Sequence, residues 1–182
     1  MLDIYKSQFP DVAIPDTPLT PYVLRHAERL ADKPALVDGA SGRTLTYAEF
    51  AHAVKSLAGG LKARGFGKGD VLAIMAPNIP EYAVAFHGTA WSGGTVTTIN
   101  PTYTAHEVQH QLKDSGATLL VTISMFLPIA KEAVEGTKVE QIFTIDPSDV
   151  DPLTALMGEP LQDQAEVASS DVVALPYSSG TT

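Results

Sequence analysis

Short strand-like runs alternate with helical patterns through the middle of the chain, and this alternation limits the possible fold more than any other feature. The runs cover residues 71–75, 95–99, 119–123 and 141–145. The first run is entirely apolar, as expected of a strand that is buried on both faces of a sheet. Strands and helices that alternate at this spacing are typical of βαβ units, whose strands are parallel. The sequence therefore predicts an α/β fold with a mostly parallel sheet flanked by helices.

The helical patterns carry their own start and stop signals. Thr46 with Glu49, and Thr104 with Glu107, have the spacing of capping boxes, in which each side chain bonds the other residue's backbone amide. Asn78 precedes a third helical pattern as its expected cap. Glycines that would end these patterns are Gly65, Gly93 and Gly116. Upstream, we expect a proline-rich arm, a short helix at residues 22–30 and a hairpin between residues 35 and 45.

Composition excludes several functional classes. The chain has 182 residues and a net charge of −9, which argues against a general binder of nucleic acid or anionic membranes. It contains no cysteine, which excludes a disulfide scaffold and any Cys-ligated metal site. No window approaches ~18 uninterrupted apolar residues and the first residues do not form a secretory signal. We therefore expect a cytoplasmic protein with no membrane span and no nucleic-acid partner.

Residues 146–171 differ in composition from the rest of the chain. They hold seven acidic residues and no Lys or Arg, and so carry −7 of the net charge of −9. We interpret this stretch as an acidic surface excursion with one helical turn near residues 153–157. An acidic docking surface is the alternative interpretation.

The end of the chain combines an apolar run with small polar residues. Residues 172–177 have strand character, and the residues that follow are Ser178, Ser179, Gly180, Thr181 and Thr182. A strand that runs into such a loop is a common phosphate site, because small residues let backbone amides converge on the anion. The stretch is not a Walker loop, since the Gly-x-x-x-x-Gly-Lys-Ser/Thr pattern is missing. From the residues alone, a polar chain end is the commoner explanation.

Leu175-Pro176-Tyr177-Ser178-Ser179-Gly180-Thr181-Thr182 resembles the start of the phosphate-binding signature of the adenylate-forming enzymes. Among these, the branch that it resembles most is that of the 4-coumarate–CoA ligases and related acyl-CoA synthetases. Three further stretches resemble that branch in the same order: Phe9-Pro10-Asp11 with Ile14-Pro15, Leu45 to Phe50, and Thr97 to Pro101 with Tyr103-Thr104. The resemblance therefore covers essentially the whole chain.

This resemblance implies a ligase that uses ATP, Mg²⁺, CoA and a small-molecule carboxylic acid. In the family, ATP and the acid form an acyl-adenylate with loss of pyrophosphate, and the CoA thiol then displaces AMP. By position, Ser178, Ser179, Gly180, Thr181 and Thr182 would bind the ATP phosphates; we call residues 178–182 the phosphate loop. Fatty, hydroxycinnamic and benzoic acids all remain open as substrates.

The chain also departs from the family's pattern. The signature's continuation, Gly-x-Pro-Lys-Gly, is not present, and neither are the adenine-binding segment, the acid-binding pocket, the hinge and the late catalytic Lys. We therefore expect residues 1–182 to be the first α/β subdomain of the large N-terminal domain of an AMP-forming ligase, truncated inside the phosphate loop. Such a fragment would have no catalytic residue of its own, bind ATP weakly and expose an apolar face that favours self-association. A non-catalytic assembly module is the alternative.

A second motif points to different chemistry. His106-Glu107-Val108-Gln109-His110 matches His-Glu-x-x-His, which on a helix places both imidazoles on one face for zinc, with the Glu as general base. A zinc hydrolase is thus a further alternative. Two observations favour a solvated helix instead. Glu107 is already the last residue of a predicted capping box, and no third His follows His110.

Overall fold

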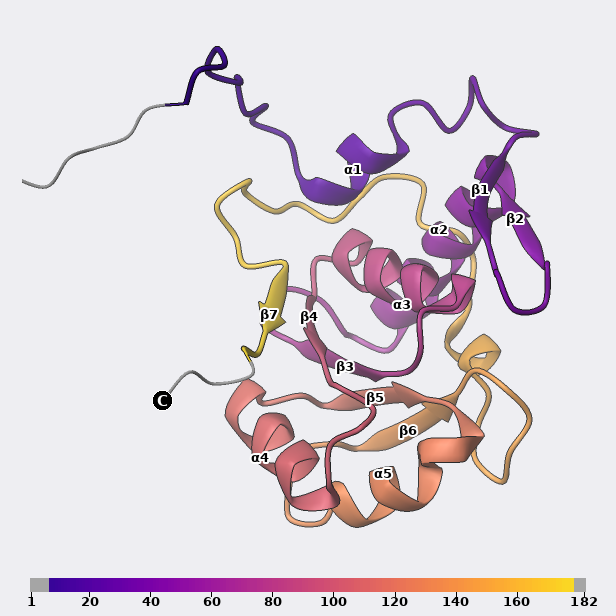
Figure 1. The fold of residues 1–182 in the computed structure, drawn as a ribbon, viewed down its shortest axis with the longest axis vertical. Helices are drawn as coiled ribbons and strands as arrows, with labels where there is room; N and C mark the ends of the chain where they lie inside the picture. The colour runs from indigo at the N-terminus through magenta and orange to yellow at the C-terminus, as the bar shows by residue number, and fades with distance from the viewer. Residues whose placement is uncertain (1–6, 179–182) are drawn as a thin grey trace, which may run out of the picture.

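A five-stranded parallel sheet forms the centre of the molecule in a computed structural model, which describes residues 7–178 (Figure 1). The strands are β3 (Val71–Met75), β4 (Thr95–Thr98), β5 (Leu119–Thr122), β6 (Gln141–Thr144) and β7 (Ala174–Pro176). Their order in the sheet is β6-β5-β3-β4-β7, and every neighbouring pair is parallel. The predicted α/β class with a mostly parallel sheet is confirmed.

Helices cover both faces of this sheet (Figure 1). They are α2 (Tyr47–Ala63) and α3 (Pro80–Trp91) on one face, and α4 (Ala105–Ser115) and α5 (Leu127–Ala133) on the other. Strand β3 requires both layers, because successive side chains point to opposite faces. Leu72 and Ile74 pack under α2 and α3, whereas Val71, Ala73 and Met75 pack under α4 and α5. Within residues 7–178, no helix combines the length and the apolar character needed to cross a bilayer.

Two of the three helix starts predicted from the sequence are confirmed. Capping boxes open α2 and α4, with Glu49 and Glu107 bonded back to Thr46 and Thr104. The cap expected at Asn78 is wrong: Ile79 is the N-cap of α3, without a side-chain hydrogen bond. Proline at the first helical position explains the difference. It has no N–H to satisfy and its φ already suits a helix, so this start depends less on a capping side chain.

The segment before the sheet differs in detail from its prediction. The hairpin is confirmed as β1 (Pro34–Val37) paired antiparallel with β2 (Thr44–Thr46). The short helix lies earlier than expected, at α1 (Leu19–Leu24), and residues 25–32 form turns. Pro18 and Pro21 fall at the N-cap and in the first turn of α1, where proline is tolerated.

The acidic stretch at residues 146–171 is more than a solvated excursion. It contains a 3₁₀ turn, η2 (Leu153–Leu156), and both end residues of that turn are buried in the core beneath α2. Gly59 and Gly60 of α2 allow this contact, because a Cβ at either position would overlap a backbone carbonyl of residues 156–159. Farther along, Trp91 Nε1 donates to the Leu161 carbonyl over 2.9 Å. The helical turn predicted near residues 153–157 is confirmed by η2, but the prediction of a surface excursion missed these apolar anchors.

Candidate functional site

The predicted phosphate loop begins where the last strand of the sheet ends. β7 pairs with β4 from Val96 opposite Ala174 to Thr98 opposite Pro176, so both strands end at the same edge. Ser178 follows two residues after β7 and is exposed. Ser179, Gly180, Thr181 and Thr182 lie outside the described residues.

This edge of the sheet also contains the point where the direction of winding reverses. β3 is followed by α3 on one face of the sheet, whereas β4 is followed by α4 on the opposite face. The chain then crosses β3 to form β5 on its other side. In open α/β sheets, ligands bind in the crevice that such a reversal leaves beyond the carboxyl ends of the strands.

A polar cavity of about 280 Å³ occupies this crevice. Its polar side chains come from the ends of β3, β4 and β7 and from α3 and α4, and they are Asn78, Tyr82, Thr98, Asn100, Tyr103, Gln111 and Tyr177. Ligand pockets typically measure about 300–1,000 Å³, so the volume of this cavity is just below that range. Among the described residues that line it, none is Lys or Arg. Hydroxyl and amide groups therefore dominate its chemistry.

Gln111 is the most buried polar residue of the cavity, with 2% of its surface exposed. Its Nε2 donates to Thr97 Oγ1 over 2.9 Å and to the Thr98 carbonyl over 3.0 Å. Its Oε1 is buried and has no hydrogen-bond partner among residues 7–178. A buried acceptor without a donor costs about 1–3 kcal/mol, so a donor from a ligand, water or further chain would stabilise this site.

Tyr177 connects the cavity to helix α4. Its hydroxyl donates to Asp114 Oδ2 at the end of that helix. Burial, together with the hydrogen bond and negative charge of Asp114, raises the pKa of Tyr177 to about 12. The phenol therefore stays protonated and keeps donating throughout the physiological pH range.

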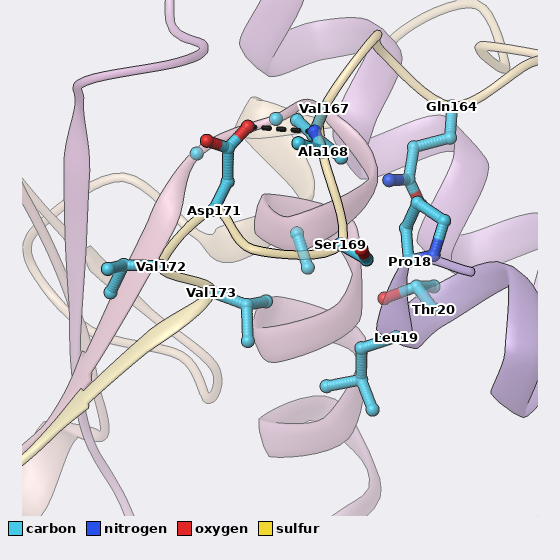
Figure 2. A pocket seen from close by; sticks show the side chains of 13 residues that line it. Pro18, Leu19, Thr20, Gln164, Val167, Ala168, Ser169, Asp171, Val172 and Val173 are labelled. Carbon is cyan, nitrogen blue, oxygen red and sulfur yellow. Dashed lines mark hydrogen bonds between the residues drawn. The ribbon is translucent and has the colours of Figure 1, made fainter. Parts of the chain in front are cut away.

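A smaller cavity of about 80 Å³ lies at the opposite end of β7 (Figure 2). Figure 2 shows Pro18, Thr20 and Gln164 beside it, with Val172 and Val173 leading into the strand. The dashed line is the 2.9 Å bond from the Ala168 amide to Asp171 Oδ2. This cavity is too small for a nucleotide and lies away from the edge where the phosphate loop begins.

The His-Glu-x-x-His motif is not arranged as a metal centre. Glu107 uses its Oε2 to accept from the Thr104 amide and hydroxyl, each over 2.8 Å, and these bonds lower the pKa of Glu107. His106 and His110 are exposed on α4. In the part of the chain that the structure describes, no group of three or more His, Cys, Asp or Glu side chains could hold a metal ion.

Sequence reasoning missed several residues of the cavity. Tyr82 and Tyr103 both line the cavity, and neither was predicted to be a binding residue. Gln111 has a signal that could have identified it. It follows Val108 by three residues on the buried face of α4, where a polar side chain needs a polar partner.

Comparison with known proteins gives a consistent result. The family model described as AMP-binding enzyme matches residues 23–182. 4-Coumarate–CoA ligase 3 of Oryza sativa subsp. japonica is 38% identical over 98% of this chain and 33% of its own length. 4-Coumarate–CoA ligase 1 of Petroselinum crispum is also 38% identical, over 98% of this chain and 34% of its own. The chain thus spans about a third of the length of the curated relatives it matches.

Solved structures share the fold. A long-chain-fatty-acid-CoA ligase (FadD1) from Archaeoglobus fulgidus has a TM-score of 0.87 at 28% identity, covering 97% of this chain and 37% of its own. The anthranilate CoA ligase AuaEII in complex with anthranoyl-AMP has a TM-score of 0.81 at 22% identity, covering 92% and 33%. At that lower identity the likeness concerns the fold alone.

Proposed function

The chain belongs to the AMP-binding enzyme family of carboxylate–CoA ligases, and from this premise we propose that it forms the first α/β subdomain of such a ligase. The intact enzyme would join a carboxylic acid to ATP as an acyl-adenylate, releasing pyrophosphate. CoA would then displace AMP to give a thioester.

Within this chain, we propose that the phosphate loop binds the ATP phosphates through Ser178, Ser179, Gly180, Thr181 and Thr182. The observation that carries the proposal is the position of Ser178, one strand away from the winding reversal and next to Tyr177 of the polar cavity. Hydroxyl groups and backbone amides are suitable donors for phosphate oxygens. When bound, ATP supplies the activated phosphate bond, and Mg²⁺ offsets its charge.

The charge of the site supports weak binding of ATP by residues 1–182 alone. The cavity lining within residues 7–178 includes no Lys or Arg, and the chain carries a net charge of −9. ATP would therefore depend on neutral donors and Mg²⁺ in this part of the enzyme. We propose that this chain binds Mg-ATP without catalysing adenylation.

The acid substrate is proposed from the relatives' names. The two curated relatives reported above are 4-coumarate–CoA ligases, and the structural relative at 28% identity is a long-chain-fatty-acid-CoA ligase. An enzyme that contains this chain should exchange labelled pyrophosphate into ATP only when an acid is present. 4-Coumarate and a long-chain fatty acid are the two acids to compare first.

Calorimetric titration of the chain with Mg-ATP tests the phosphate loop. We expect weak but saturable binding, and we expect Ser178→Ala to raise the Kd. A hydrogen bond to a charged group contributes about 1.5–3 kcal/mol, so the increase should be about tenfold or more. Pyrophosphate exchange by the chain alone should stay at background.

Ser170→Ala is the matched control, since Ser170 is also exposed and precedes the strand rather than following it. The same increase in Kd with both variants would argue against a specific phosphate site at Ser178. Acid-dependent pyrophosphate exchange by the wild-type chain would contradict the proposal that it does not catalyse adenylation.

A further inference from the structure

Strand β7 has little backbone support of its own. It is three residues long, lies at the edge of the sheet and, within residues 7–178, pairs only with β4. A short strand with a single neighbour has few ladder hydrogen bonds, so side chains contribute much to its placement. Two such contacts lead to helix α4.

The first contact runs through Gln111. Its Nε2 donates to Thr97 Oγ1 over 2.9 Å, and Thr97 Oγ1 in turn donates to the Leu175 carbonyl of β7 over 3.0 Å. Gln111 and Thr97 are both buried, with 2% and 0% of their surface exposed. Water therefore competes little for these bonds, and they connect α4 through β4 to β7.

The second contact is the bond from the Tyr177 hydroxyl to Asp114. Tyr177 directly follows β7, and Asp114 lies one turn beyond Gln111 near the end of α4. The two bonded residues are 63 positions apart in the sequence. It holds the chain next to the cavity, one residue before the phosphate loop.

We propose that Asp114 is a positioning residue for the phosphate loop. Through Tyr177, it determines where the chain leaves the sheet at Ser178, and Gln111 and Thr97 support β7 behind it. This inference rests on the proposed function, because the loop needs positioning only if it binds a ligand. Binding geometry is sensitive to small displacements, so a contact outside the loop can affect affinity within it.

The test compares Mg-ATP binding and amide hydrogen exchange at the non-proline residues of the range 174–178 in variants of the 182-residue chain. We expect Asp114→Ala and Tyr177→Phe each to raise the Kd about three- to tenfold, the effect of one hydrogen bond. Both should also speed exchange at these amides while leaving the Tm unchanged. Asp114→Asn keeps an oxygen acceptor for the phenol and removes one negative charge, so it should exchange like the wild type and bind Mg-ATP at least as tightly.

Two control variants match the chemical changes. Asp163→Ala removes an exposed carboxylate from another surface, and Tyr47→Phe removes the hydroxyl of a half-buried tyrosine at the start of α2. Neither residue lines the cavity, so both variants should bind and exchange like the wild type. They distinguish loss of the specific bond from loss of any carboxylate or phenol.

Several results would overturn the inference. Wild-type affinity in Asp114→Ala and Tyr177→Phe would do so, as would an Asp114→Asn variant as weak as Asp114→Ala. A fall in Tm that accounts for the lost affinity would indicate a purely structural role. If the wild-type chain does not bind Mg-ATP at all, the proposed phosphate site fails, and amide exchange alone then decides whether α4 positions β7.

Discussion

His87 shows how the environment of one side chain makes stability depend on pH. It lies half-buried on α3, with Nδ1 3.0 Å from Thr20 Oγ1 and its ring edge-on to those of Phe50 and Phe86. Burial lowers the pKa of His87 below its ordinary value of 6.5, because the charged form is poorly solvated there. The hydrogen bond ties α1 to the core while the imidazole is neutral.

The direction of the pH effect follows from that lowered pKa. Between the folded and the unfolded pKa, the unfolded chain binds more protons, so the free energy of unfolding decreases as pH falls below the unfolded value. Urea unfolding should therefore show stability decreasing between about pH 7.5 and 5.5. The decrease should be smaller in His87→Gln. His110→Gln replaces an exposed histidine and is the control, so its stability should decrease with falling pH as much as that of the wild type. If the free energy of unfolding changes equally with pH in the wild type, His87→Gln and His110→Gln, the role of His87 is contradicted.

At the scale of elements, helix α2 packs closely against η2 of the acidic stretch, a contact that was not predicted from the sequence. Glycine in a helix interior normally destabilises by about 1 kcal/mol relative to alanine, so Gly60→Ala would ordinarily stabilise α2. Here a Cβ at Gly60 would overlap the Leu156 carbonyl. We expect Gly60→Ala to lower the free energy of unfolding by about 1–3 kcal/mol, the usual cost of overpacking.

Denaturant unfolding measures whether Gly60→Ala lowers the free energy of unfolding instead of raising it. Gly39→Ala is the matched control, because a Cβ at Gly39 would have no atom within 4 Å and its φ is not in the left-handed region. That variant should change stability by less than about 0.5 kcal/mol. A stabilised Gly60→Ala variant would show that η2 can move away from α2 without cost.

The elements that could be predicted are those whose signals are local. Capping boxes at Thr46 and Thr104 depend on residues three positions apart, and a strand such as β3 shows its burial in its own composition. The resemblance of residues 175–182 to a known signature is the basis for predicting the phosphate loop, and this assignment stays a prediction. The cavity could not be predicted in this way, because Gln111 and Tyr177 become neighbours only through the strand order.

At the scale of the whole molecule, negative charge is the property that most affects an anionic ligand. The net charge is −9, and residues 146–171 carry seven acidic side chains. Lys68 pairs with Asp171 over 2.7 Å and Lys131 with Asp149 over 2.6 Å, both near the surface. These lysines come from outside the acidic stretch and offset only part of its charge. The chain should therefore repel Mg-ATP at long range, before any contact is made.

This charge predicts an unusual salt dependence for nucleotide binding. Raising KCl from about 20 to about 200 mM shortens the Debye length to below ~10 Å and screens long-range repulsion. At constant free Mg²⁺, the Kd for Mg-ATP should therefore decrease severalfold. Proteins that hold phosphates with Lys and Arg show the opposite trend, because salt weakens those attractions. An affinity that falls with salt would mean that cationic side chains contact the phosphates in this chain, and that neutral donors and Mg²⁺ are not the main source of binding.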